Sequence, residues 1–308
     1  MHITDRIHDS RWGIFNHYLW GNKFEISGAA SWDDCVKGID VKRLAEDIRD
    51  SGAHFYFITL MQGFKYMIAP NRTFDEIGGT APGDACASRD VIAELADELA
   101  KYNIDLYLYF TGDGPYKNED VGCRFGFIEP REKGVTRDFV EKWAAVLEEY
   151  AVRYKDAVKG WWMDGCYDFF KYNDELLSIY HRAIKKGNPD AVAGYNNGVK
   201  PYYAKHFSGE EITCGEFNDF YVIPRERFID RDKNGGAQAF MLAPLGAAPD
   251  GIEWNAWGQK GSKHDGKYMR DFVSCANTNG GVVTIDVWVS PTGRLDPEQM
   301  RVLREIDR

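Results

Sequence analysis

The stretch Trp161-Trp162-Met163-Asp164-Gly165 places a carboxylate directly after three bulky apolar residues and before a glycine. A run of this kind is typical of a parallel strand that is buried on both faces and ends at a tight turn. In barrels built from such strands, chemistry is concentrated at the carboxyl ends, which is where Asp164 stands. A turn or helix N-cap residue is the alternative interpretation of this aspartate.

Seven further runs share this β-rich composition, and amphipathic segments separate several of them. The eight expected strands are residues 12–18, 55–60, 104–110, 161–163, 192–195, 212–217, 238–243 and 282–288. Apolar residues at i, i+3, i+4 and i+7 predict helices over residues 41–50, 89–102, 139–154 and 174–186. The alternation predicts an α/β protein with a single (β/α)8 TIM-type barrel that takes up residues 1–308.

Two features of the chain bear on the alternatives to this architecture. A doubly wound open sheet is the competing fold, and it is disfavoured because no glycine-rich phosphate loop follows the first strand. The segment 225–236 is charged and ends in Gly235-Gly236, so it is expected to be mostly loop instead of a further helix.

The composition excludes several classes of protein. The 308 residues carry 48 Asp and Glu against 38 Lys and Arg, a net charge of −10 that does not suit binding to nucleic acid. A hydrophobic content of 44% excludes disorder as the main state, and no apolar run reaches the roughly 18 residues of a membrane span. The polar N-terminus lacks the apolar stretch of a signal peptide, which indicates a cytoplasmic protein or a trimmed leader. Six cysteines without a CxxC pair predict buried thiols, with no metal site and no cofactor.

Two carboxylates stand at strand ends where they could face each other across the mouth of a barrel. Asp164 ends the fourth strand and Glu216 the sixth. Such a pair suits glycoside hydrolysis with retention, in which a nucleophile and a general acid/base lie about 5 Å apart. One of the two must stay ionised while the other holds a proton, so their environments must differ. A solvated loop residue is the alternative interpretation of Glu216.

Other residues near strand ends are candidates for holding a sugar. The polar candidates are His17, Gln62, Asn196 and Asn197, and the aromatic candidates are Trp162, Trp257 and Trp288. Aromatic faces stack on sugar rings, although most aromatic residues of any protein belong to its core. Further polar residues at strand ends are Thr111, Asp113 and Asp286.

Several motifs, taken in order, carry a resemblance to a known family. Residues 12–17 (WGIFNH) are similar to an FGIFIHWG strand, and residues 44–56 are similar to a helix and strand that end in AGAKY. Residues 89–95 are similar to an RDLVGEL helix, and residues 106–109 to the GLYYS strand that follows it. Residues 162–165 are similar to WFDG, and residues 277–295 to SKGGNLLLNVGPTPDGRI. From about Arg11 to Ile306, the chain thus resembles the catalytic domain of the α-L-fucosidases of glycoside hydrolase family 29. The resemblance implies a barrel fold and a retaining exo-glycosidase with Asp164 as its nucleophile.

The departures from the family pattern matter equally. The family's KHHDGF motif, whose two histidines contact fucose, stands here as Leu60-Met61-Gln62-Gly63-Phe64. Both histidines are missing, which predicts a related or modified sugar instead of a plain fucoside. The position of the acid/base varies within the family, so Glu216 is the first candidate and Glu253 the second. The family's C-terminal β-sandwich has no counterpart after the last expected helix.

Two other classes of function remain open at this point. A barrel that binds glycans without catalysis would keep the aromatic residues but lack a close carboxylate pair. A metal-dependent hydrolase or a lyase would need histidines and carboxylates that converge on one ion. The groups that line the barrel mouth distinguish these classes.

Overall fold

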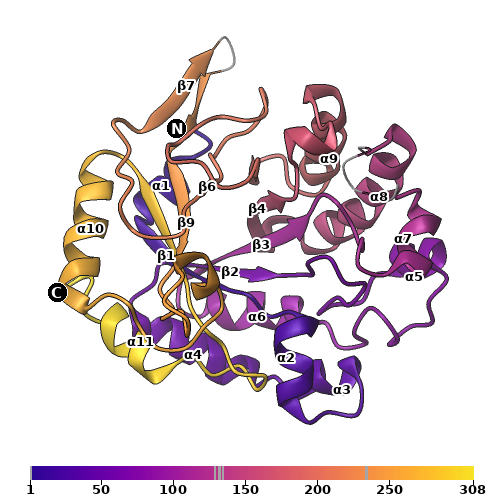
Figure 1. Ribbon diagram of the computed structural model, residues 1–308, viewed down its shortest axis with the longest axis horizontal. Helices are drawn as coiled ribbons and strands as arrows, with labels where there is room; N and C mark the ends of the chain where they lie inside the picture. Colours follow the sequence, from indigo (N-terminus) through magenta and orange to yellow (C-terminus); the bar gives the residue numbers. More distant parts are fainter. Residues whose placement is uncertain (1, 128–129, 131–132, 134, 233–234) are drawn as a thin grey trace.

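The computed structural model describes residues 2–127, 130, 133, 135–232 and 235–308 (Figure 1). Its centre is an eight-stranded sheet in which every neighbouring pair is parallel, in the order β5-β4-β3-β2-β1-β10-β9-β6. The strands are β1 (Trp12–Asn16), β2 (Phe55–Thr59), β3 (Asp105–Thr111), β4 (Val158–Asp164), β5 (Val192–Tyr195), β6 (Gly215–Glu216), β9 (Phe240–Pro244) and β10 (Val282–Asp286). They confirm the eight predicted strands, with the sixth shortened to two residues.

Helices cover the outside of the sheet. They are α1 (Asp5–Asp9), α2 (Trp20–Ser27), α3 (Trp32–Lys37), α4 (Val41–Ser51), α5 (Arg72–Gly78), α6 (Val91–Ala100), α7 (Glu119–Phe125), α8 (Arg137–Tyr154), α9 (Asp174–Gly187), α10 (Gly266–Thr278) and α11 (Pro297–Leu303), with short 3₁₀ turns η2 (Lys155–Ala157), η3 (Asp168–Phe170) and η4 (Glu253–Ala256). The four predicted helices are confirmed as α4, α6, α8 and α9. Among the residues described, no helix is both long and apolar enough to cross a bilayer.

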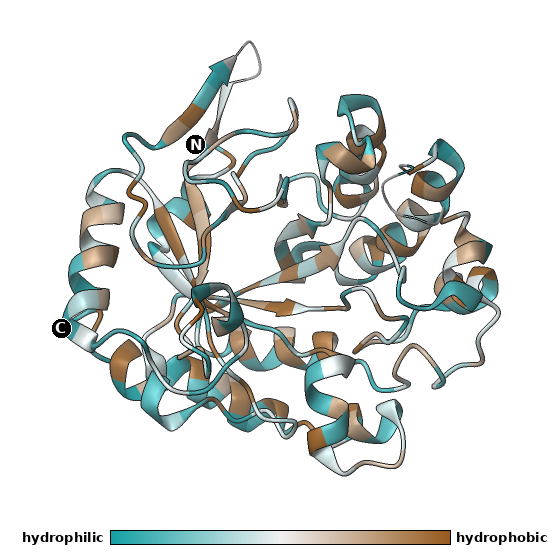
Figure 2. Cartoon of the chain, in the orientation of Figure 1, coloured by the Kyte–Doolittle hydropathy of each residue, from teal (hydrophilic) through white to brown (hydrophobic). Residues whose placement is uncertain are grey.

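The helix boundaries follow from local side-chain chemistry. The Thr136 hydroxyl accepts a hydrogen bond from the backbone N–H of Phe139 and so caps α8, as its place in the sequence predicts. Asn173 caps α9 in the same way through the N–H of Leu176. The helices α4, α6, α8 and α9 turn an apolar face inward and a charged face to water, as the hydropathy colouring shows (Figure 2).

The sheet is strongly curled, since side chains from distant strands meet on its inner side. The ring of Phe240 on β9 lies 6.0 Å from that of Phe55 on β2 and 6.1 Å from that of Trp162 on β4. The two edge strands of the sheet, β5 and β6, also approach each other. The backbone N–H of Glu211, which precedes β6, donates to the carbonyl of Ala193 on β5 at 3.0 Å. The architecture is a parallel α/β fold that is compatible with a TIM-type barrel.

One expectation about the connections is wrong. Residues 225–236, predicted to be mostly loop, include the antiparallel hairpin of β7 (Phe228–Asp232) and β8 (Gly235–Gln238). The hairpin lies at the edge of the molecule (Figure 1). Backbone hydrogen bonds pair its two strands, so the sequence here needs no apolar run. Between β5 and β6, and between β6 and β9, the described residues form no helix.

Candidate active site

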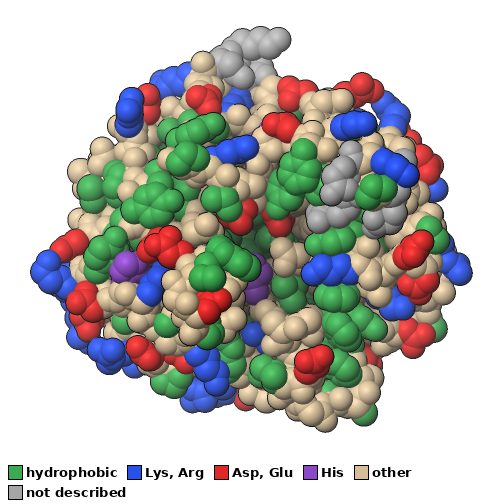
Figure 3. All heavy atoms as spheres, in the orientation of Figure 1, with side chains coloured by type: hydrophobic (Ala, Val, Ile, Leu, Met, Phe, Trp, Pro, Cys, Tyr) green, Lys and Arg blue, Asp and Glu red, His purple; other side chains and the backbone are tan. Residues whose placement is uncertain are grey.

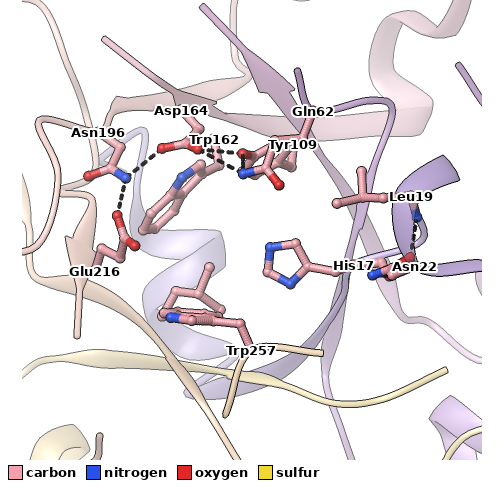
Figure 4. Close-up of a pocket in the computed structure, with 11 residues that line it drawn as sticks. His17, Leu19, Asn22, Gln62, Tyr109, Trp162, Asp164, Asn196, Glu216 and Trp257 are labelled. Carbon is pink, nitrogen blue, oxygen red and sulfur yellow. Dashed lines mark hydrogen bonds between the residues drawn. The ribbon is translucent and has the colours of Figure 1, made fainter. Parts of the chain in front are cut away.

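The carboxyl ends of the parallel strands surround a cavity of about 280 Å³. The face that carries it is hollowed near its centre (Figure 3). The cavity is lined by His17, Leu19, Asn22, Gln62, Tyr109, Trp162, Asp164, Asn196, Glu216, Leu242 and Trp257 (Figure 4). Seven of these eleven were predicted from the sequence, because they stand at or just beyond strand ends.

Asp164 is the last residue of β4, and the turn after it requires a glycine. Gly165 has a φ of +69°, and a Cβ on it would lie 2.7 Å from the Cγ of Asp113. The chain therefore leaves the strand sharply, and the Asp164 carboxylate stays in the cavity with 8% of the residue exposed. The turn predicted for the WMDG motif is thus confirmed, and the same turn leaves the Asp164 carboxylate at the cavity.

Three hydrogen-bond donors surround the Asp164 carboxylate. The Tyr109 hydroxyl and the Gln62 amide, at 3.3 Å, donate to Oδ2, while the Asn196 amide donates to Oδ1 at 2.6 Å. Such a set of donors stabilises the negative charge of a buried carboxylate. Both oxygens of the Asp164 carboxylate thus accept hydrogen bonds from side chains of neighbouring strands and loops.

Glu216, at the end of β6, is in the opposite situation. Burial and the nearby negative charge of Asp164 raise the pKa of Glu216 to about 7, against the smaller lowering effects of the Asn196 hydrogen bond and of His17. A carboxyl group with this pKa is about half protonated at pH 7, so it can serve as a proton donor. The two carboxylates are therefore differentiated in the way that paired acid/base chemistry requires.

The separation of the two carboxylates is limited by a shared partner. The amide nitrogen of Asn196 donates to Oδ1 of Asp164 at 2.6 Å and to Oε2 of Glu216 at 2.5 Å. These two oxygens can lie no further apart than the sum of the two lengths, 5.1 Å. Inverting glycosidases keep their carboxyl groups roughly 6.5–9.5 Å apart, to leave room for a water molecule, whereas retaining ones keep them about 5 Å apart.

The shared amide makes Asn196 a sensitive position, and we expect Asn196→Ala to lower kcat/KM by on the order of 10²-fold. Without the donated hydrogen bond, the pKa of Glu216 should rise above its present value, because that bond lowers it. The alkaline limb of the pH–rate profile should therefore move to higher pH. Asn188→Ala is the matched control, since the Asn188 amide bonds the Val158 carbonyl at the opposite end of β4. An unchanged pH profile in the Asn196 variant would contradict the shared-donor role.

Three residues predicted for the site do not line the cavity. The Asn197 amide donates to Asp168 at 2.6 Å and accepts from the Asp168 N–H, so it fixes the 3₁₀ turn η3. Trp288 packs beneath the ammonium groups of Lys23 and Lys260. Glu253, the second candidate for acid/base, is exposed in η4.

Four lining residues were not predicted. Tyr109 and Leu242 lie inside strands, where a bulky side chain has the appearance of core, and Leu19 and Asn22 come from the segment that enters α2. Tyr109 could have been found from the strand register. It pairs with Trp162 on the neighbouring strand, two residues before Asp164. Among the described residues, no group of three His, Cys, Asp or Glu side chains is arranged to hold a metal ion.

Comparison of sequences finds no match to a protein-family model or to a curated protein. Comparison of structures finds proteins with the same fold. An endo-fucoidan hydrolase of glycoside hydrolase family 107 superposes with a TM-score of 0.75 and 15% identity, over 98% of this chain and 63% of that protein. The chain shares its fold with this glycoside hydrolase.

Two α-L-fucosidases also match. A family 29 enzyme from Bacteroides thetaiotaomicron superposes with a TM-score of 0.65 and 16% identity, over 99% of this chain and 72% of that one. A variant of the α-L-fucosidase AlfC in complex with Fucα(1,6)GlcNAc gives 0.65 and 15%, over 98% and 97% of the two chains. The resemblance to family 29 predicted from the motifs is thus confirmed at the level of the fold. The chain spans slightly less than two thirds of the length of the first family 107 structure.

Proposed function

We propose that this protein is a retaining exo-glycosidase of the α-L-fucosidase type, built on a single closed (β/α)8 barrel. It would release a terminal fucose, or a related or modified sugar, from a glycan. The observation that carries the proposal is the closeness of Asp164 and Glu216. Both accept a hydrogen bond from the Asn196 amide nitrogen, so Oδ1 of Asp164 and Oε2 of Glu216 lie within 5.1 Å of each other. The fold likeness supports the same class of chemistry.

The reaction would proceed in two steps at the anomeric carbon. In the first, an Asp164 oxygen attacks this carbon while the Glu216 carboxyl gives its proton to the departing glycosidic oxygen. A glycosyl–enzyme ester and the free leaving alcohol result. In the second, the Glu216 carboxylate takes a proton from water, whose oxygen displaces Asp164 and releases the sugar with its original anomeric configuration.

The other walls of the cavity would hold the sugar. Trp162 and Trp257 offer apolar surface for a ring face, while His17 offers a ring nitrogen to a hydroxyl. The volume of about 280 Å³ lies just below the range for small-molecule sites, roughly 300–1,000 Å³. This size favours one sugar ring over a long stretch of polysaccharide, and therefore exo action.

The identity of the sugar is proposed from Gln62, which stands in the stretch where the family pattern has two histidines. Its amide nitrogen bonds the Tyr109 hydroxyl at 2.7 Å and also Asp164, so it supports the nucleophile instead of reaching for a sugar hydroxyl. A site with this arrangement has fewer donors for the hydroxyl groups of fucose. A deoxy sugar or a fucose derivative with a substituted hydroxyl would fit it better.

A panel of aryl glycosides tests the proposal. We expect turnover of at least one aryl glycoside of fucose, of a substituted fucose or of a related deoxy sugar, with the retained anomer appearing first by proton NMR. Efficient turnover of plain aryl α-L-fucoside, above that of all derivatives, would contradict the altered specificity. Binding of monosaccharides without turnover of any substrate would instead support a glycan-binding protein.

A further inference from the structure

A further buried carboxylate, outside the lining of the cavity, contacts one of the residues that line it. Asp286, the last residue of β10, is 1% exposed, and its Oδ1 lies 2.8 Å from Nδ1 of His17. Its other oxygen, Oδ2, accepts the backbone N–H of Gly258 at 2.7 Å. Both carboxylate oxygens are therefore engaged, one by the imidazole and one by the loop that carries Trp257.

The His17 ring is held firmly between aromatic neighbours. Its centroid lies 4.6 Å from that of Phe15 and 5.7 Å from that of Trp257, which it meets edge to face. The backbone carbonyl of His17 also accepts from the Asn22 amide at 3.0 Å. With Nδ1 engaged by Asp286, the imidazole reaches into the cavity toward the side that holds Asp164 and Glu216 (Figure 4).

We propose that Asp286 is a positioning residue, which holds the proton of His17 on Nδ1 and presents a bare Nε2 to the cavity as a hydrogen-bond acceptor for a sugar hydroxyl. The carboxylate has only acceptor atoms, so its partner nitrogen must be the one that carries the hydrogen. In the neutral ring, the second nitrogen is then an acceptor. The assignment of this acceptor to a sugar rests on the proposed function, whereas the tautomer of His17 does not.

Further charged groups lie around the pair of Asp286 and His17. Lys23 on α2 is buried, with 1% of the residue exposed, and the negative charge of Asp286 stabilises its ammonium group. Burial, with a smaller contribution from the nearby Lys260, lowers the pKa of Lys23 to about 8, against the raising effect of Asp286. On the cavity side, the groups that face the ring are the carboxyls of Asp164 and Glu216. Lys23 therefore supplies a positive charge beside Asp286 that does not depend on a proton on Nε2 of His17.

The same carboxylate also fixes a second wall of the cavity. Gly258 has a φ of +63°, and it follows Trp257 directly in the chain. Its N–H bond to Asp286 determines where the loop passes and thus where the indole of Trp257 lies against His17. Asp286 therefore orients both a polar and an apolar contact for one sugar ring.

The substitution Asp286→Asn keeps the size of the side chain but changes what it offers to Nδ1 of His17, so it tests whether Asp286 positions the proton of His17 or only fills space. The amide has one oxygen for two donors, so if the oxygen keeps the Gly258 bond, the NH₂ group faces Nδ1 of His17. The imidazole proton should then move to Nε2, which becomes a donor. We expect Asp286→Asn to raise the KM of the best aryl glycoside by about 10- to 100-fold, the effect of one mismatched buried hydrogen bond, with a smaller change in kcat.

Nitrogen-15 NMR of histidine-labelled protein decides the proposal. In the wild type, the signals lost in His17→Gln should show the Nδ1–H tautomer, and in Asp286→Asn they should shift toward the Nε2–H tautomer. Asp219→Asn is the matched control, because Asp219 bonds Nε2 of His264 at 2.6 Å outside the cavity, and it should leave the His17 signals unchanged. An Nε2–H tautomer in the wild type would overturn the proposal even if the Asp286 variant does not fold. Absence of turnover in the wild type would count against the proposed function alone.

Discussion

Replacing Asp164 by alanine should abolish turnover, with a loss in kcat on the order of 10⁴-fold or more. The variant lacks the carboxylate that accepts from three donors at the cavity, so no glycosyl–enzyme ester can form. The effect should appear in kcat for every substrate, whatever its leaving group. It is measured with the best aryl glycoside from the panel under single-turnover conditions.

Rescue by an external nucleophile makes this result specific. Removing the carboxylate leaves space beside the anomeric carbon, and azide should restore part of the rate and yield a glycosyl azide of inverted configuration. Asp168→Ala is the control, because Asp168 lies four residues further along, is exposed, and bonds Asn197 outside the cavity. Full activity of Asp164→Ala would remove this residue as nucleophile. Loss of activity without azide rescue, in a folded variant, would leave only a structural role.

The strands of this fold were predictable because they are buried on both sides. A stretch such as 161–163 has to be apolar throughout when one face meets the inner core and the other meets helices. The hairpin of β7 and β8 has no such requirement. Its strands pair with each other at the edge of the molecule, so Arg231 and Gly235 are compatible with it, and the sequence resembles a loop.

The site was predictable where strand ends determine side-chain placement. Asp164, Glu216 and Asn196 were found by this rule. The rule does not distinguish neighbours, since Asn196 points into the cavity while Asn197 bonds Asp168 outside it. Tyr109 was missed for a different reason, because its phenol ring belongs to the inner core and only its hydroxyl reaches the nucleophile.

Glu216→Gln should have the second large effect, and its size should depend on the leaving group. For alcohols that need protonation on departure, we expect kcat/KM to fall by about 10²–10⁴-fold, the range for loss of a general acid. Aryl groups that leave as stable phenolates should show a smaller loss in the first step. Glu253→Gln tests the alternative acid/base, and near-normal activity is expected because Glu253 is exposed in η4. The reverse pattern would show the assignment to be wrong.

The pH dependence of the wild type follows from the same group. Because the pKa of Glu216 is raised to about 7, the protonated acid is lost as pH increases through this value, and kcat/KM for poor leaving groups should decline there. In Glu216→Gln this alkaline limb should be absent. A limb that persists unchanged in the variant would assign the titration to another group.

We expect Glu216→Gln to make the folded protein more stable at alkaline pH, although it lowers activity. A carboxyl whose pKa is higher in the folded than in the unfolded protein favours folding while it is protonated, and that contribution is lost as pH rises from the unfolded value toward about 7. Glutamine carries no charge at any pH, so Glu216→Gln should melt at a higher temperature than the wild type at pH 8, and the difference should shrink at pH 4. A variant that is less active and yet more stable at pH 8 separates a functional carboxylate from a structural one, because a structural group would lose both together.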